Sequence, residues 1–225
     1  MKRAYNTSSS LYWHKNAKQF AQFYRNRSQL LSSETVVNIF LSQRTKTLLS
    51  YAPVTSKTIM LDLGCGSGEH MKEFIPRAGF VYGIDYSKQM IELAKQELNK
   101  YPSNKYQLIQ SDAGRLTIKK QSIDIIIAMG LLDYVASPDK VISECRRVLR
   151  PNGVFVFSMP KIPSVFSFFR TPIGIHIRKI LFHLPPIKNA MTSSEVKQLL
   201  ANHGFVIQHS TSVWSAMWMI KATVL

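Results

Sequence analysis

Short apolar runs alternate with longer amphipathic segments between residues 57 and 160. The runs are almost continuously apolar, which is typical of strands in a parallel sheet that is covered on both faces. Because strands and helices alternate with short connections, the sequence predicts a doubly wound α/β sheet. The predicted strands are Thr58–Leu63, Phe80–Ile84, Tyr106–Ile109, Ile123–Met129 and Val154–Ser158.

Two of the amphipathic segments have apolar side chains at the three- and four-residue spacing of a helix. Ser87 can cap the first helix, and the sequence Pro151–Gly153 is a stop-and-turn signal after the second. We expect both apolar stripes to pack against the sheet. They are Met90, Ile91, Ala94 and Leu98 in the first helix, and Val141, Ile142, Cys145, Val148 and Leu149 in the second.

The N-terminal flank has a helical pattern of its own. Residues 16–50 predict two helices, and the second begins near Ser33. We therefore expect residues 1–56 to form an N-terminal helical cap or lid. The inner face of the second helix would consist of Val36, Val37, Phe40, Leu41, Thr47 and Leu48.

The C-terminal flank first interrupts the alternation and then resumes it. Residues 161–190 are rich in proline, aromatic and basic residues and predict an insert within a domain that spans residues 57–225. A helix follows over Thr192–Asn202, with a capping-box signature at its start. Closing strands are predicted over Phe205–His209 and Ala216–Val224.

Composition narrows the class of protein. The chain has 225 residues, of which 45% are hydrophobic, enough to form a buried core. Two cysteines, Cys65 and Cys145, cannot form a disulfide framework, and no Cys/His spacing resembles a metal site. The first residues lack the apolar stretch of a secretory signal, and the longest apolar run, Ile125–Leu132, is too short to cross a bilayer. We therefore expect a cytoplasmic protein without a bound metal.

The strongest functional signal is the sequence LDLGCGSG at residues 61–68. An apolar strand runs into Gly64, Gly66 and Gly68, and a helix is predicted directly after them. Glycines at such a turn let a ligand approach the backbone where a Cβ would collide, and free N–H groups at a helix start can receive an electronegative group. A tight turn without a ligand would use glycines too, so the loop alone does not decide the function.

Acidic residues stand at the ends of the next two predicted strands. A carboxylate at Asp85 can accept both hydroxyls of a ribose, and one at Asp112 can meet an adenine amino group. Each could instead cap a helix or lie in solvent. Open α/β sheets bind ligands at the carboxyl edge of their strands. The glycine loop and these two acids follow three successive strands, which favours a nucleoside site.

The glycine spacing excludes two common nucleotide-binding loops. The dinucleotide fingerprint G-x-G-x-x-G would need a glycine where the chain has Glu69 or Met71. No Gly-Lys-Ser/Thr sequence follows, so the loop is not a P-loop. The spacing is G-x-G-x-G, with Asp62 inside the preceding strand.

These residues resemble the class I S-adenosylmethionine-dependent methyltransferases. LDLGCGSG is similar to the first motif of the family, GIDYSKQM to the second, and SDA to the adenine-side loop. Residues 123–135 and 144–160 are similar to the fourth-strand motif and the fifth-strand region. The resemblance implies S-adenosylmethionine as cofactor and a mostly parallel, seven-stranded Rossmann-like sheet. Its last strand would be antiparallel, with N-terminal helices and a helical lid insert after strand five.

The resemblance also implies which residues contact the cofactor. The three loop glycines would line its methionine and ribose, and Asp85 would hold the ribose diol. Asp62 would organise the loop or receive the amino group, while Cys65 would be a packed small residue and not a nucleophile. The remaining contacts would be Tyr86 and Met90 beside the adenine, Asp112 and Ala113 at its edge, and Met129 and Gly130 on the sulfonium side.

The chemistry implied is methyl transfer by in-line displacement, which needs alignment and exclusion of water but no metal. A hydroxyl acceptor usually needs a general base, whereas a carboxylate does not. Asp133 and Tyr134, just beyond the fourth strand, are candidate bases, with Asp133 in the best position. His14, His70 and His176 are further candidates, although each could be purely structural. O-methylation is the expected reaction.

We expect a small, hydrophobic or anionic acceptor. The loop Met129–Tyr134 lacks the Asn/Asp-Pro-Pro-Tyr/Phe pattern of family members that methylate nucleobase amino groups or glutamine amides. This loop is more similar to those of enzymes that act on quinones, tetrapyrroles, sugars, lipids or natural products. A nucleic-acid-modifying enzyme and a non-catalytic module that keeps the cofactor fold stay open as alternatives.

The formal charge of +16 is concentrated in the flanks. Residues 1–56 and 161–225 carry +7 and +6, whereas residues 57–160 carry +3. The flanks could form an acceptor pocket with a basic rim that attracts an anion, or an interfacial segment on anionic lipid. A packed lid with a solvated basic face is the third interpretation.

Overall fold

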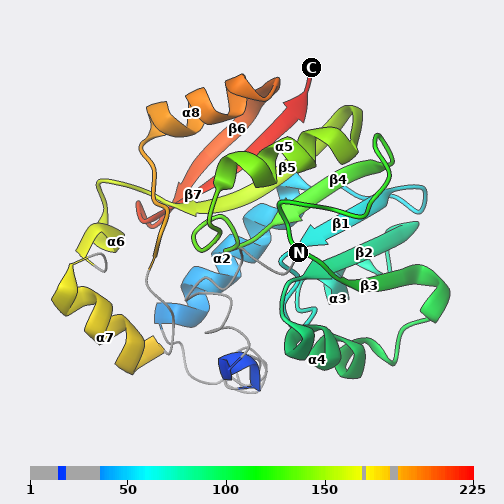
Figure 1. Cartoon of the computed structure of the whole chain (residues 1–225), viewed down its shortest axis with the longest axis horizontal. Helices are drawn as coiled ribbons and strands as arrows, with labels where there is room; N and C mark the ends of the chain where they lie inside the picture. The colour runs from blue at the N-terminus through cyan, green and yellow to red at the C-terminus, as the bar shows by residue number, and fades with distance from the viewer. Residues whose placement is uncertain (1–14, 19–35, 169–170, 183–186) are drawn as a thin grey trace, which may run out of the picture.

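The computed structural model describes residues 15–18, 36–168, 171–182 and 187–225. Its centre is a seven-stranded sheet with the order β3-β2-β1-β4-β5-β7-β6 (Figure 1). β7 is antiparallel to both of its neighbours and all other pairs are parallel, which confirms the predicted architecture. The strands are β1 (Ile59–Leu63), β2 (Phe80–Asp85), β3 (Tyr106–Gln110), β4 (Ile123–Ala128), β5 (Leu149–Pro160), β6 (Phe205–Val213) and β7 (Met217–Val224).

Helices cover both faces of this sheet (Figure 1). Side chains from α5 and α8 belong to the core on one face, and side chains from α2, α3 and α4 belong to the core on the other. α6 and α7 form the helical insert after β5. The bounds are α2 (Val36–Tyr51), α3 (Met71–Phe74), α4 (Lys88–Leu98), η1 (Ser103–Lys105), α5 (Pro138–Val148), α6 (Val165–Phe168), α7 (Pro172–Phe182) and α8 (Ser193–Asn202).

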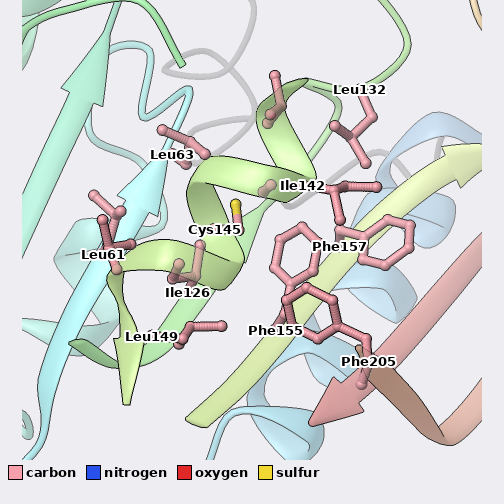
Figure 2. Packing of buried hydrophobic residues seen from close by; sticks show 14 of the residues in the cluster. Leu61, Leu63, Ile126, Leu132, Ile142, Cys145, Leu149, Phe155, Phe157 and Phe205 are labelled. Carbon is pink, nitrogen blue, oxygen red and sulfur yellow. The ribbon is translucent and has the colours of Figure 1, made fainter. Parts of the chain in front are cut away.

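The apolar strands alternate their side chains between the two cores. Leu61 and Leu63 of β1 enter the core beneath α5, whereas Met60 enters the opposite one. Figure 2 shows the first of these cores, where Phe155 stacks on Phe157 with ring centroids 4.8 Å apart. The apolar runs of β1 and β4 are therefore nearly continuous, because most of their residues are buried on one face or the other.

Two helix caps that the sequence predicts are confirmed, and one helix end is corrected. The Ser87 hydroxyl accepts a hydrogen bond from the backbone N–H of Met90, and Thr192 forms the complete capping box. The assignment of Leu149 to the helix of α5 was wrong, since that helix ends at Val148 and Leu149 begins β5. β5 therefore starts before the Pro151–Gly153 sequence, which bends the strand instead of preceding it.

The structure also corrects two other boundaries. The helix predicted directly after the glycine loop begins only at Met71 and lasts four residues, because turns occupy the intervening positions. β6 extends to Val213, four residues beyond the predicted end at His209. Three of the four added residues are polar, and Ser210 and Thr211 are exposed, because β6 lies at the sheet edge, so an apolar pattern could not detect them.

α2 packs against β6 and β7 at one end of the sheet. Leu41 and Leu48 are buried as predicted, and the ring of Phe40 meets Trp214 edge-on at 5.5 Å. Thr47 was assigned to the inner face but is only partly buried, with its hydroxyl bonded to the Gln43 carbonyl. The side chains of Val36 and Val37 lie outside the described part, as do residues 1–14 and 19–35, so the lid role of residues 1–56 stays a prediction.

We expect Phe157→Ala to lower the free energy of unfolding by about 3–5 kcal/mol, because Phe157 is 1% exposed and its removal leaves a cavity. Urea unfolding would measure the change. Phe168→Ala is the matched control, since Phe168 is 47% exposed and should cost about 1 kcal/mol or less. Equal losses in the two variants would contradict the core placement.

Candidate active site

The glycine loop lies at the carboxyl edge of the sheet, where the strand order reverses between β1 and β4. The backbone N–H groups of Gly64 and Cys65 both donate to the Ile84 carbonyl, at 2.7 and 3.0 Å. Within the loop, the Gly68 N–H donates to the Cys65 carbonyl at 2.9 Å. These bonds fix the loop after β1 against the end of β2.

The three loop positions require glycine for different structural reasons. All three have positive φ, but a Cβ on Gly64 would lie 3.0 Å from Leu131, and one on Gly68 would lie 3.1 Å from Leu98. A Cβ on Gly66 would meet nothing within 4 Å. Gly64 and Gly68 are therefore needed for packing within the protein, whereas Gly66 leaves its outer side open to a ligand.

Asp85 connects the end of β2 to this loop. Its Oδ2 accepts a hydrogen bond from the Gly66 N–H at 2.9 Å, and its Oδ1 accepts one from the Ser87 N–H at 2.8 Å. Burial raises the pKa of the Asp85 carboxyl, and the backbone hydrogen bonds counteract that rise. A carboxylate has about four acceptor positions and Asp85 has three backbone N–H partners, so the group can still accept a hydroxyl from a ligand.

Asp62 is a buried acid in the middle of the strand that leads into the loop. Its side chain is 1% exposed, and neither carboxyl oxygen has a hydrogen-bond partner among the described residues. Burial first, and the charge of Asp85 second, raise the pKa of Asp62 to about 8. A buried acid without a local partner is unfavourable in the empty protein and suits a ligand that brings a cationic donor.

The predicted adenine-side residues fall into two groups. Tyr86 is 47% exposed, and Asp112 and Ala113 are partly exposed in the loop after β3. The Asp112 Oδ1 accepts the Gly114 N–H at 2.8 Å, so this side chain also shapes its own loop. Met90 is only 2% exposed in the first turn of α4 and packs in the interior.

The loop after β4 is held by two distant elements. The Gly130 N–H donates to the hydroxyl of buried Ser158 on β5, at 2.8 Å. The Asp133 carbonyl accepts the backbone N–H groups of Lys188 and Asn189 at the end of the insert. The Asn189 side-chain amide adds two further bonds, to the carbonyls of Leu132 and Val135 at 2.8 and 2.9 Å. The insert therefore clamps the loop that carries the candidate bases.

Two residues of this region have no motif that could reveal them. Asn189 lies 54 positions after Val135 in the chain, so only the fold brings them together. Arg44 of α2 is 5% exposed, and its Nη1 lies 4.0 Å from the position of a Cβ on Gly130. Among the residues described, Arg44 alone of the basic side chains is buried. The sequence did contain one indication that Arg44 is buried: it lies between Leu41 and Leu48 on the apolar stripe of α2.

The structure places the other candidates as follows. Asp133 is buried at 4% exposure and Tyr134 is partly buried, both in the clamped loop beside Leu132. His14 lies outside the described residues. His70 directly precedes α3, and His176 is exposed on α7.

Cys65 is 5% exposed, and burial raises the pKa of its thiol well above the ordinary value. The thiol is therefore protonated at neutral pH, as the prediction of a packed, non-nucleophilic residue requires. The described residues contain no group of three His, Cys, Asp or Glu side chains placed to hold a metal. Within the same part of the chain, no helix is both long and apolar enough to span a membrane.

The sequence of the central region decides the family. Residues 61–157, which include the glycine loop, both strand-end acids and the β4 loop, match the family model of the methyltransferase domain. Residues 61–157 are therefore a methyltransferase domain.

Named methyltransferases are similar to part of this chain. The chain is 34% identical over 106 residues to malonyl-[acyl-carrier protein] O-methyltransferase of Halalkalibacterium halodurans, covering 44% of this chain and 38% of that protein. It is 34% identical over 100 residues to a ubiquinone biosynthesis O-methyltransferase of Coxiella burnetii, covering 44% and 42%. The match thus spans less than half of either relative.

A solved methyltransferase shares the whole fold. The crystal structure of a SAM-dependent methyltransferase from Aquifex aeolicus superimposes with a TM-score of 0.66 at 18% identity. It covers 88% of this chain and 98% of that one. The sheet and its flanking helices are therefore those of the methyltransferase fold, beyond the residues that match in sequence.

The methyltransferase site fits S-adenosylmethionine in two respects. Gly66 leaves open the space that a cofactor needs in order to approach the backbone. Asp62 offers a buried carboxyl whose oxygens have no hydrogen-bond partner among the described residues, and the cofactor has a cationic amino group. The sites of the adenosyl contacts stay predictions.

The raised pKa of Asp62 predicts a distinctive pH dependence of stability. The folded pKa of about 8 exceeds the unfolded value of about 4, so the folded protein binds the extra proton between these values. The contribution of Asp62 to the free energy of unfolding should therefore be most favourable below pH 4. It should decrease as the pH rises to 8, by up to about 1.4 kcal/mol per pH unit.

Asp62→Asn should remove this loss, and urea unfolding of the cofactor-free protein at pH 5 to 8 would show it. We expect the variant to gain stability over wild type as the pH rises. Asp112→Asn is the control, because its amide oxygen can still accept the Gly114 N–H. Parallel pH profiles for wild type and Asp62→Asn would contradict the burial of an acid with a raised pKa.

Proposed function

We propose that this protein transfers a methyl group from S-adenosylmethionine to an oxygen atom of a small acceptor. The observation that carries the proposal is Asp62, a buried acid with no partner in the described structure, beside a loop that is open at Gly66. The acid destabilises the empty protein, which is expected of a group retained for binding and not for folding. Catalysis instead of passive binding is favoured by the relatives, which are named as methyltransferases.

On the cofactor side, the described residues bind and orient. Asp62 would receive the cationic amino group, and Asp85 would accept ribose hydroxyls while it holds the Gly66 N–H. When bound, the cofactor supplies an electrophilic methyl group. Alignment of that methyl with the acceptor oxygen, in a space that excludes water, would provide most of the rate enhancement.

The acceptor side would be formed by the β4 loop and by α2. The Arg44 guanidinium lies next to Gly130, at the strand end that faces the glycine loop through Leu131. A buried cation at this place would attract an acceptor that carries a carboxylate or that becomes a phenolate. Both named relatives are O-methyltransferases, and a malonyl group carries a free carboxylate, which agrees with this charge.

Asp133 would serve as general base only if the acceptor is a hydroxyl. Its side chain is buried and its backbone is held by the insert, so the loop would place the carboxyl in a site that excludes water. An ionised carboxylate acceptor is already a nucleophile and would use the same loop for positioning alone. The two acceptor chemistries can therefore be separated by the response to loss of Asp133.

Gly66→Ala tests the cofactor site with a backbone-matched control. Gly66 and Gly204 both have positive φ, and a Cβ at Gly204 would meet only Arg146, at 3.5 Å. Both alanine variants should therefore lose about 1–2 kcal/mol of stability from backbone strain. Only Gly66→Ala should weaken binding of S-adenosylhomocysteine, by 10-fold or more in calorimetry, because its methyl occupies the open space. Unchanged affinity in that variant would refute the cofactor site.

A second test uses labelled S-adenosylmethionine with two acceptors, a malonyl thioester and a catechol. We expect Asp133→Asn to slow transfer to the catechol by about 10²–10⁴-fold and transfer to the malonyl carboxylate by much less. Arg44→Gln should raise KM for the malonyl thioester while leaving S-adenosylhomocysteine binding intact. If the wild-type protein binds S-adenosylhomocysteine but transfers a methyl group to neither acceptor, it would be a binding module, and the proposal would be contradicted.

A further inference from the structure

The insert after β5 exposes large apolar side chains. Ile173 and Ile180 on α7 are 69% and 57% exposed, and Phe168 at the end of α6 is 47% exposed. Ile173 and Ile180 are seven residues apart, which is two helical turns, so they share one face of α7. Isolated exposed apolar residues are common, but a shared face on an 11-residue helix is a surface that can be covered.

The sequence around this face contains no acidic residue. From residue 145 to residue 194 there are eight Lys and Arg side chains and not one Asp or Glu. The acids of the chain are concentrated elsewhere, since residues 57–160 hold eleven of the thirteen. The charge of the insert is therefore complementary to a negatively charged partner.

A groove lies where the insert leaves the sheet. It has a volume of about 540 Å³, and its lining includes Lys161, Lys197 and Trp218. The Lys161 Nζ lies 4.7 Å from the centre of the Trp218 ring, so this cation and this aromatic ring face the groove together. Tryptophan beside lysine is typical of the boundary between lipid headgroups and acyl chains.

The insert is also connected to the acceptor side of the site. Figure 1 shows α6 and α7 at one end of the molecule, away from the C-terminus. The chain then returns to the β4 loop, where Lys188 and Asn189 bond to the Asp133 carbonyl. The insert that carries α7 is therefore joined at its end to the loop predicted to receive the acceptor.

We propose that Phe168, Ile173, Ile180, Lys161, Lys197 and Trp218 form a surface that docks on an anionic lipid bilayer. The apolar side chains would enter the interfacial region, and the lysines would contact lipid phosphates. A second copy of this chain is a poorer occupant, because residues 161–190 carry five Lys and Arg side chains and no acid, and two such segments repel each other. Docking would let the enzyme collect a lipophilic acceptor from the membrane, and it does not depend on cofactor binding.

Flotation with vesicles tests this surface. We expect the wild-type protein to float with vesicles of phosphatidylcholine and 30% phosphatidylglycerol, and binding should fall at least 10-fold at high salt. The double variant Ile173→Glu/Ile180→Glu should lose at least 10-fold in vesicle affinity while retaining S-adenosylhomocysteine binding. Ile173→Ser/Ile180→Ser removes the apolar contact without adding charge and should show a smaller loss in the same direction.

The matched control is Val206→Glu/Leu225→Glu, which places the same two charges at exposed apolar positions on β6 and at the C-terminus. This control should float like the wild type. The proposal would be overturned if the control lost as much vesicle affinity as Ile173→Glu/Ile180→Glu. It would also be overturned if the wild type bound pure phosphatidylcholine vesicles as well as the anionic ones. Sedimentation that shows a dimer broken by Ile173→Glu/Ile180→Glu would assign the face to a second copy instead. A protein that binds S-adenosylhomocysteine but does not float would refute membrane docking alone.

Discussion

Asp62 places a carboxyl group inside an apolar strand, and the rest of the site is arranged around it. Its neighbours on the sheet are apolar or glycine, and within the described structure neither oxygen finds a donor. The fold tolerates this group because two apolar cores hold β1 in place on both faces. Burial of an acid at such a position is unfavourable for the empty protein and gives a bound cation a strong, specific partner.

The surrounding contacts keep the glycine loop after this acid fixed. Two backbone N–H groups bond to the Ile84 carbonyl, and the Asp85 carboxylate accepts from Gly66, so β2 determines where the glycine loop stands. The β4 loop closes over Gly64 through Leu131 and is itself clamped by Asn189. In the proposed site, the cofactor side and the acceptor side would thus be positioned by different parts of the sheet, which would allow the acceptor to vary while the cofactor site stays unchanged.

The sheet and its glycine loop could be predicted because they depend on local patterns. Continuous apolar runs marked the parallel strands, and Ser87 and Thr192 marked two helix starts. The polar end of β6 could not be predicted from the apolar pattern, because an edge strand is specified by pairing with its neighbour and not by burial. Arg44 and Asn189 could not be predicted as site residues for a similar reason, because each contacts the β4 loop only after the chain has folded. Which of the three glycines faces open space could not be predicted either, because all three share the same sequence context.

The most direct test of this account is the titration of the Asp62 carboxyl by carbon NMR, in the free protein and with S-adenosylhomocysteine. The account predicts a pKa near 8 in the free protein, because the group is buried, and a fall of several units when the cationic amino group binds. A carboxyl that titrates near 4 in the free protein, or whose pKa does not move when S-adenosylhomocysteine binds, would contradict it.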